Sequence, residues 1–144
     1  MGTDFKSVPI TTTTTQMKKD DAEFLLSPDE TLDSLFNGRL KILQKKEGYR
    51  FSIDAVLLSQ FVNIRRNEKA IDLGTGCGIL PLILSQTTNA CSIVGVEIQK
   101  ELAECAVKNV ILNRLEDRIS ILRRDFRKLK ASFPGVNSSV LKLR

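Results

Sequence analysis

The sequence predicts an α/β protein built around a doubly wound parallel sheet, and three observations carry this prediction. Short apolar segments alternate with segments of helical periodicity over residues 69–122. Three glycines, Gly74, Gly76 and Gly78, stand at alternate positions directly after the first apolar segment. Each strand-like segment ends at or near an acidic residue. A strand, a glycine turn and a helix in this order are typical of a nucleotide site at the carboxyl end of a parallel strand.

The order of the elements over this region is strand, helix, strand, helix, strand. The expected bounds are strand 69–73, helix 79 to about 86 or 87, strand 92–97, helix 100–112 and strand 119–122. Pro81 falls in the first turn of its helix, where a missing N–H is tolerated. Because crossover connections between strands of one sheet are right-handed, the three strands are expected to be parallel.

The N-terminal region has weaker signals. Residues 1–28 contain five consecutive threonines and mixed charges, which predicts a disordered leader. Ser27 to Asp33 has helix-start chemistry, and Leu32, Leu35 and Phe36 predict a short helix that ends at 37–38. We therefore expect three parts, which are a leader over 1–28, an N-terminal helix, hairpin and second helix over 29–66, and an incomplete cofactor-binding domain over 67–144.

A β-hairpin is expected over residues 39–51, with its turn at Lys45 to Gly48. A helix is expected to follow directly. Ser52 is a suitable N-cap because its hydroxyl can accept from the free N–H groups of the first turn. Ala55 to Phe61 then provides the helix with a wide apolar face.

Composition excludes several kinds of site. The chain has no His, which removes Ser-His-Asp and Cys-His catalysis and every His-based metal site. Cys77, Cys91 and Cys105 form no C-x-x-C pair, so we expect reduced thiols in a cytoplasmic protein. No apolar run approaches the ~20 residues of a membrane span, and the first ten residues do not read as a signal peptide.

The net charge of +5 is unevenly distributed along the chain. Residues 1–38 hold three Lys and seven acids, a net charge of −4, whereas residues 39–144 carry +9. The basic part is compatible with a polyanionic partner such as RNA, and equally with a solvated basic face.

The glycine turn does not match the common phosphate-binding motifs. It reads Asp-x-Gly-x-Gly-x-Gly, which is neither G-x-G-x-x-G nor a P-loop. An acid, Asp72, two residues before the first glycine disfavours a phosphate and suits a ligand with an ammonium group and hydroxyls. S-adenosylmethionine has both, and residues 72–78 resemble motif I of the Rossmann-like S-adenosylmethionine-dependent methyltransferases. The alternative is a tight strand-to-helix turn with chance glycines.

Two further acids lie at strand ends. Glu97 lies 19 residues after Gly78, the spacing at which a carboxylate accepts hydrogen bonds from ribose hydroxyls. Asp125 suits the exocyclic amine of adenine, and Asp72 suits the methionine end of the ligand. The alternatives are a cap on the next helix for Glu97 and an ion pair with Arg123, Arg124 or Arg127 for Asp125.

Residues 32–128 resemble one family, the bacterial tRNA1(Val) adenine-37 N6-methyltransferases. The matching stretches are 35–44, 48–58, 72–78, Gly95-Val96-Glu97 and Arg124-Asp125. The resemblance implies the N-terminal part of a class I methyltransferase sheet, preceded by a β-hairpin, and a tRNA substrate. It implies that six residues bind S-adenosylmethionine, namely Asp72, Gly74, Gly76, Gly78, Glu97 and Asp125. It also places Arg50, Phe51 and Ser52 along the same pocket, and it implies neither a membrane nor a metal.

The sequence departs from this family near residue 137. The family's catalytic Asn-Pro-Pro-Tyr is missing, so no catalytic residue is assigned. Val140 to Arg144 stands where the fourth strand begins, and we expect a truncated product that keeps the cofactor half. The alternatives are a relative of the glutamine N5-methyltransferases of release factors, and a non-catalytic binding module completed by a partner chain. Without such a partner, residues 129–144 are expected to be disordered.

Overall fold

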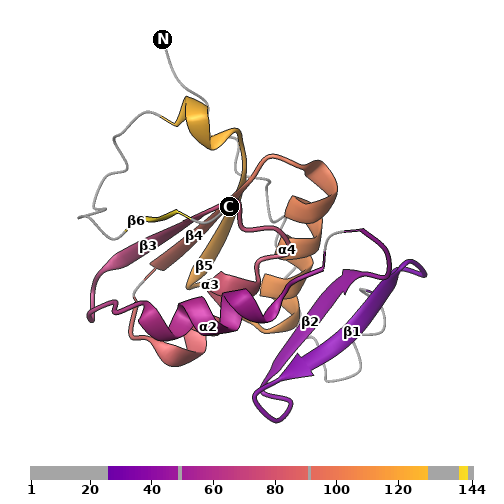
Figure 1. The fold of residues 1–144 in the computed structure, drawn as a ribbon, viewed down its shortest axis with the longest axis horizontal. Coiled ribbons are helices and arrows are strands. Elements are labelled where there is room, and N and C mark those ends of the chain that lie inside the picture. Colours follow the sequence, from indigo (N-terminus) through magenta and orange to yellow (C-terminus); the bar gives the residue numbers. More distant parts are fainter. Residues whose placement is uncertain (1–25, 49, 91, 130–139, 143–144) are drawn as a thin grey trace.

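The computed structural model describes residues 26–48, 50–90, 92–129 and 140–142 (Figure 1). The leader predicted over 1–28 therefore lies outside the described residues up to position 25. The described part consists of a four-stranded sheet, three α-helices and a separate two-stranded hairpin. None of the described helices is long and apolar enough to cross a membrane.

The main sheet is parallel and has the strand order β5-β4-β3-β6. Its strands are β3 (Lys69–Leu73), β4 (Ser92–Glu97), β5 (Ile119–Arg123) and β6 (Val140–Lys142). The first three confirm the predicted β-α-β-α-β unit. Pairing of β6 with β3 continues the sheet on its other side, so the expectation of disorder over 129–144 is wrong for residues 140–142.

Two of the three helices pack directly on the sheet, and α3 (Ile79–Thr87) lies at the centre of the packing. All residues from Ile79 to Ser85 are buried. A helix that is apolar on all sides has to be enclosed by other elements, and α3 lies between the sheet, α2 (Ile53–Phe61) and α4 (Lys100–Leu112). The predicted helices at 79–87 and 100–112 and the helix after Ser52 are confirmed.

The hairpin lies earlier in the chain than the sequence predicts. Its strands are β1 (Glu30–Leu35) and β2 (Leu40–Lys45), in antiparallel register from Glu30 opposite Lys45 to Leu35 opposite Leu40. The predicted short helix that ends at 37–38 and the hairpin bounds 39–51 are therefore wrong. The Asn37-Gly38 pair is the hairpin turn, with φ of 55° and 82°, and not the end of a helix.

Burial explains why this segment is a strand. From Thr31 to Leu35, half-buried and exposed residues alternate, so one side of this part of the strand faces the protein and the other faces water. Leu32 is exposed, and the apolar positions that suggested a helix face do not share one buried side. Arg50 and Phe51, predicted to form the return strand, lie in the loop before α2.

The hairpin packs on α4 partly through an ion pair. The Glu30 carboxylate is buried and lies 3.0 Å from Lys108 Nζ on α4, and it also accepts from the Ser27 N–H at 2.9 Å. Burial by itself would raise the pKa of Glu30, but the Ser27 and Lys108 hydrogen bonds outweigh it, and the pKa is lowered. The ion pair therefore holds the start of β1 against the helix.

Candidate functional site

The glycine turn after β3 is folded against the end of β4. The N–H groups of Gly74 and Thr75 both donate to the Val96 carbonyl, at 2.8 and 2.9 Å. Gly74, Gly76 and Gly78 have φ of 81°, 59° and 82°, which side chains with a Cβ rarely adopt. The alternating glycines are thus required by the backbone conformation of this turn.

Glu97, at the end of β4, is bound by the turn on one side and by the start of α4 on the other. Its Oε2 accepts from the Gly76 N–H and its Oε1 from the Gln99 N–H, both at 2.9 Å. The residue is only 6% exposed. Because a carboxylate has about four lone-pair sites, two remain available for a ligand.

A pocket of about 240 Å³ opens beside these groups. It is lined by Gly74, Gly76, Val96, Glu97, Ile98, Gln99, Leu102 and Phe126. The site thus combines bare backbone, one carboxylate and an apolar rim. Such a combination suits the ribose hydroxyls and the flat apolar ring of a nucleoside.

Three of the six predicted cofactor residues line this pocket, namely Gly74, Gly76 and Glu97. Asp72 is buried, at 3% exposure, in register with Gly95 of β4. Gly78 begins α3, and a Cβ there would lie 3.2 Å from the Cβ of Ala106 on α4. Gly78 is therefore needed for close packing of two helices.

Asp125, the sixth predicted residue, is paired with Arg127. Its Oδ2 lies 2.7 Å from Arg127 Nη2, and its Oδ1 accepts from the Arg127 N–H at 3.0 Å, which caps the short 3₁₀ helix η1 (Phe126–Lys128). This is the ion pair that the sequence left open as an alternative. The Arg127 side-chain hydrogen bond, opposed by desolvation, lowers the pKa of Asp125 to about 2.

This pKa leads to a prediction. The contribution of the Asp125 pair to folding is fully present above its ordinary pKa of 3.8, and it is lost as the pH falls toward 2. In Arg127→Gln the midpoint is expected to rise toward 3.8, measured by carboxyl carbon chemical shifts in NMR. The control Arg123→Gln, at the exposed end of β5, should leave the midpoint near 2. An unchanged midpoint in Arg127→Gln would contradict the pairing.

The residues before α2 serve the hairpin and the helix. The Arg50 guanidinium donates to the Lys45 carbonyl at 2.9 Å and pairs with Asp33 at 3.1 Å. The Phe51 N–H donates to Gln44 Oε1, and Ser52 caps α2, accepting from the Asp54 N–H. None of Arg50, Phe51 and Ser52 is among the residues that line the pocket.

Gly95 allows the turn to lie directly on β4. A Cβ at this position would come within 2.8 Å of Thr75 Oγ1 and within 2.9 Å of Thr75 Cγ2 and Ile121 Cδ1. The isoleucine tip can rotate away, but Thr75 is buried in a turn whose N–H is already bonded to Val96. Thr75 Oγ1 has no hydrogen-bond partner among the described residues.

We therefore expect Gly95→Ala to destabilise the fold by about 1–3 kcal/mol through overpacking, measured by chemical denaturation. The double variant Gly95→Ala with Thr75→Ala removes the two crowded Thr75 atoms and leaves only the isoleucine tip, so it should recover most of this loss. If the losses in unfolding free energy of the two single variants simply add in the double variant, Thr75 is not the group that the new methyl meets.

The two cysteines in the described part of the chain are buried and poorly suited to nucleophilic chemistry. Burial raises the pKa of Cys77 to about 11 and that of Cys105 to about 12. The Cys105 thiol donates to the Leu43 carbonyl at 3.2 Å. Both thiols are therefore protonated at neutral pH. Within the described ranges, no group of three His, Cys, Asp or Glu side chains is placed to hold a metal.

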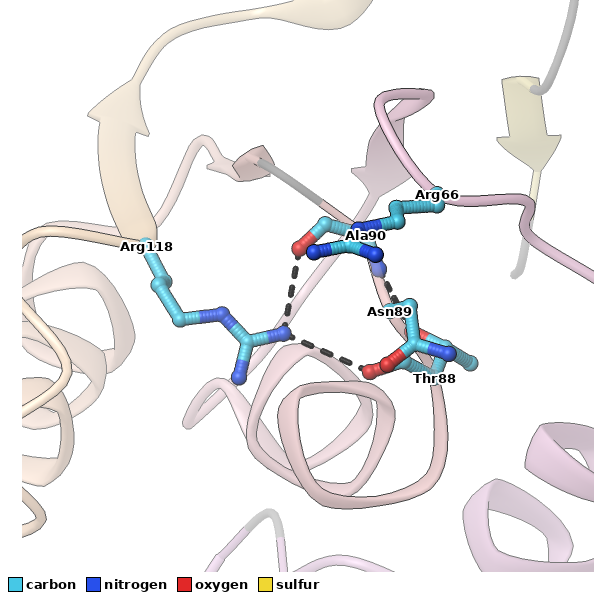
Figure 2. Close-up of a pocket in the computed structure, with 5 residues that line it drawn as sticks. All are labelled: Arg66, Thr88, Asn89, Ala90 and Arg118. Carbon is cyan, nitrogen blue, oxygen red and sulfur yellow. Dashed lines mark hydrogen bonds between the residues drawn. The ribbon is translucent and has the colours of Figure 1, made fainter.

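A second, larger pocket of about 440 Å³ lies where the chain enters β3, β4 and β5, at the amino ends of these strands. Figure 2 shows the residues that line it. Its lining residues are Arg66, Thr88, Asn89, Ala90 and Arg118. The Arg118 guanidinium donates to the Ser85 carbonyl, in the last turn of α3, at 2.7 Å. It also donates to the Ala90 carbonyl, beyond the end of α3, at 3.0 Å (Figure 2). This arginine satisfies carbonyl groups at a helix end, which is a structural role.

Sequence reasoning missed part of the site. It did not single out Ile98, Leu102 and Phe126, which form the apolar rim. Phe126 carried one signal, because an aromatic residue directly follows a strand-end acid. It also missed Asn109, a fully buried amide on α4 that contacts the glycine turn.

Comparison with known proteins identifies related sequences and folds. The family model of the TRM5/TYW2 methyltransferase domain matches residues 43–138. A tRNA1(Val) (adenine(37)-N6)-methyltransferase of Photobacterium profundum is 30% identical over 92 residues, which cover 62% of this chain and 38% of that protein. The chain thus spans well under half the length of this relative.

Solved structures share the fold. TYW2 of P. horikoshii, in complex with MeSAdo, has a TM-score of 0.59 at 24% identity, covering 72% of this chain and 39% of that one. The tRNA m1G37 methyltransferase of M. jannaschii has a TM-score of 0.57 at 23% identity, covering 71% and 32%. The likeness places the sheet and helices in the Rossmann-like methyltransferase fold.

Proposed function

The chain belongs to the TRM5/TYW2 methyltransferase domain family, and from this premise we propose that its glycine-turn pocket binds S-adenosylmethionine. The observation that carries the proposal is the Glu97 carboxylate, positioned by Gly76 and Gln99 N–H groups beside the pocket. Its two spare lone-pair sites would accept from the ribose hydroxyls.

The remaining lining fits the rest of the nucleoside. Ile98, Leu102 and Phe126 supply apolar surface for the adenine ring. Gly74 and Gly76 present main chain without side chains to the part of the ligand that crosses the turn. S-adenosylmethionine supplies a methyl group on a sulfonium, and the role of this chain is to hold and orient that ligand.

The proposal also gives a role to the other three predicted residues, Asp72, Gly78 and Asp125. Asp72, at the end of β3, faces the methionine end of the ligand, and Gly78 keeps the turn close to α4. Asp125 would accept from the adenine amine, with Arg127 holding its carboxylate ionised. These roles stand on the motif order and on the position of each residue at the carboxyl edge of the sheet.

For the whole protein we infer methyl transfer to tRNA. Curated relatives are named tRNA1(Val) (adenine(37)-N6)-methyltransferases, which favours the N6 amine of an adenine as the acceptor. The M. jannaschii neighbour is named for m1G37 instead, so guanine N1 is the second candidate acceptor. The 144 residues contain no Asn-Pro-Pro-Tyr, so the proposal for this chain is limited to holding the cofactor.

The experiment is a titration of the 144-residue chain with S-adenosylmethionine and S-adenosylhomocysteine. Calorimetry measures the heat of binding, and thermal unfolding measures the change in stability. A ligand that binds only the folded state raises the stability by about 2.7 kcal/mol at 100 times its Kd. NAD is the matched control, because it carries the same adenosine with a pyrophosphate that the acidic turn disfavours. Stabilisation by NAD and not by S-adenosylhomocysteine would overturn the proposal.

A further inference from the structure

Asn109 on α4 joins the hairpin to the glycine turn. Its Oδ1 accepts from the Leu43 N–H at 2.6 Å, and its Nδ2 donates to the Leu43 carbonyl and to the Cys77 carbonyl, both at 2.8 Å. The side chain is fully buried. One amide therefore pairs with β2 as a neighbouring strand would, and it also holds the turn.

The Cys77 carbonyl depends on this side chain for a local reason. Cys77 directly precedes Gly78, the N-cap of α3, and the residue four positions later is Pro81. Proline has no N–H, so the helix cannot offer Cys77 the donor that residue 82 offers Gly78 at 3.2 Å. A buried carbonyl without a donor is costly, and Asn109 supplies it.

Asn113, the C-cap residue of α4, is a natural comparison four residues further along the chain. Its Oδ1 accepts from the Lys41 N–H at 2.9 Å, and its Nδ2 donates to the Lys41 carbonyl at 2.7 Å. It binds β2 in the same manner as Asn109, two residues earlier in the strand. It makes no contact with the glycine turn in the described residues.

We propose that Asn109 is a positioning residue of the cofactor pocket, because its amide fixes the Cys77 end of the glycine turn to strand β2 of the hairpin. The inference rests on the proposed function for its ligand. Packing of the hairpin on α4 and binding of the ligand are then linked through the Asn109 side chain. Each of the two should therefore make the other more favourable.

The test compares Asn109→Ala with the matched variant Asn113→Ala in the full chain. Both should lower the thermal stability, because both detach β2 from α4. Only Asn109→Ala should weaken S-adenosylhomocysteine binding by at least tenfold in calorimetry, and Asn113→Ala should stay within about twofold of the parent. Equal affinities in the two variants would overturn the proposal.

Two measurements cover other outcomes. Amide exchange without ligand tests the turn itself, since the Gly78 N–H, bonded to Thr75, should exchange faster in Asn109→Ala than in Asn113→Ala. Asn109→Asp keeps the acceptor for the Leu43 N–H and loses the donors to the Leu43 and Cys77 carbonyls, and it replaces Asn109→Ala if that variant does not fold. A parent that binds no ligand would contradict the proposed function alone, whereas equal Gly78 exchange would contradict the role of Asn109.

Discussion

Glu97→Gln is expected to reduce the affinity for S-adenosylhomocysteine by about 100-fold or more. The glutamine amide can present its oxygen to only one of the two backbone donors, so its NH₂ meets the N–H of Gly76 or of Gln99. Under the proposed function, the variant would also lose charge-assisted bonds to the ribose, each worth about 1.5–3 kcal/mol. Isothermal calorimetry measures the change directly.

The matched control is Glu101→Gln, which makes the same change of charge in the first turn of α4 at an exposed side chain. It should leave the affinity within about twofold, because the Glu101 side chain is exposed to water and is not among the residues that line the pocket. Equal losses in the two variants would mean that net charge near α4, and not the carboxylate of Glu97, controls binding.

Leu82→Ala is expected to lower the free energy of unfolding by about 2–5 kcal/mol, the range for a leucine deleted from a packed core. Leu82 has no exposed surface and lies in the helix that the sheet, α2 and α4 enclose. Because the surrounding helices cannot collapse into the space without leaving the sheet, a value near the upper end is expected. Urea denaturation followed by circular dichroism gives the measurement.

Leu57→Ala provides the comparison, because Leu57 is 49% exposed on α2. Its loss should cost less than about 1 kcal/mol, since little apolar area leaves the protein interior. A cost at Leu57 as large as that at Leu82 would show that α2 has an additional packing partner on its outer side.

The central part of the fold could be predicted from local sequence signals. Strand, helix and turn periodicities were strong over residues 69–122, and the positive-φ requirement at Gly74, Gly76 and Gly78 was readable from glycine alone. Glu97 was found by spacing, because a β-α-β unit has a nearly constant length and places the next strand end beside the turn.

The segment that forms β1 and the hairpin turn was predicted wrongly, because its sequence signals fit both a short helix and a strand. Leu32, Leu35 and Phe36 match a helix face, and the Asn37-Gly38 pair serves equally well as a helix end and as a hairpin turn. A strand of six residues has too few positions for its alternation to outweigh that pattern. Pairing with β2, which itself packs on α4, decided that this segment is a strand.

The sequence by itself therefore determined the parallel sheet, the glycine turn and the strand-end carboxylate, since each depends on backbone conformation or on residues close in the chain. Only the tertiary structure decided that Asp125 pairs with Arg127 and that Gly95 makes room for Thr75. It also decided that Asn109 serves two segments that are 66 and 32 residues away. Such contacts depend on packing between distant elements, and no periodicity along the chain records which buried amide will meet which carbonyl.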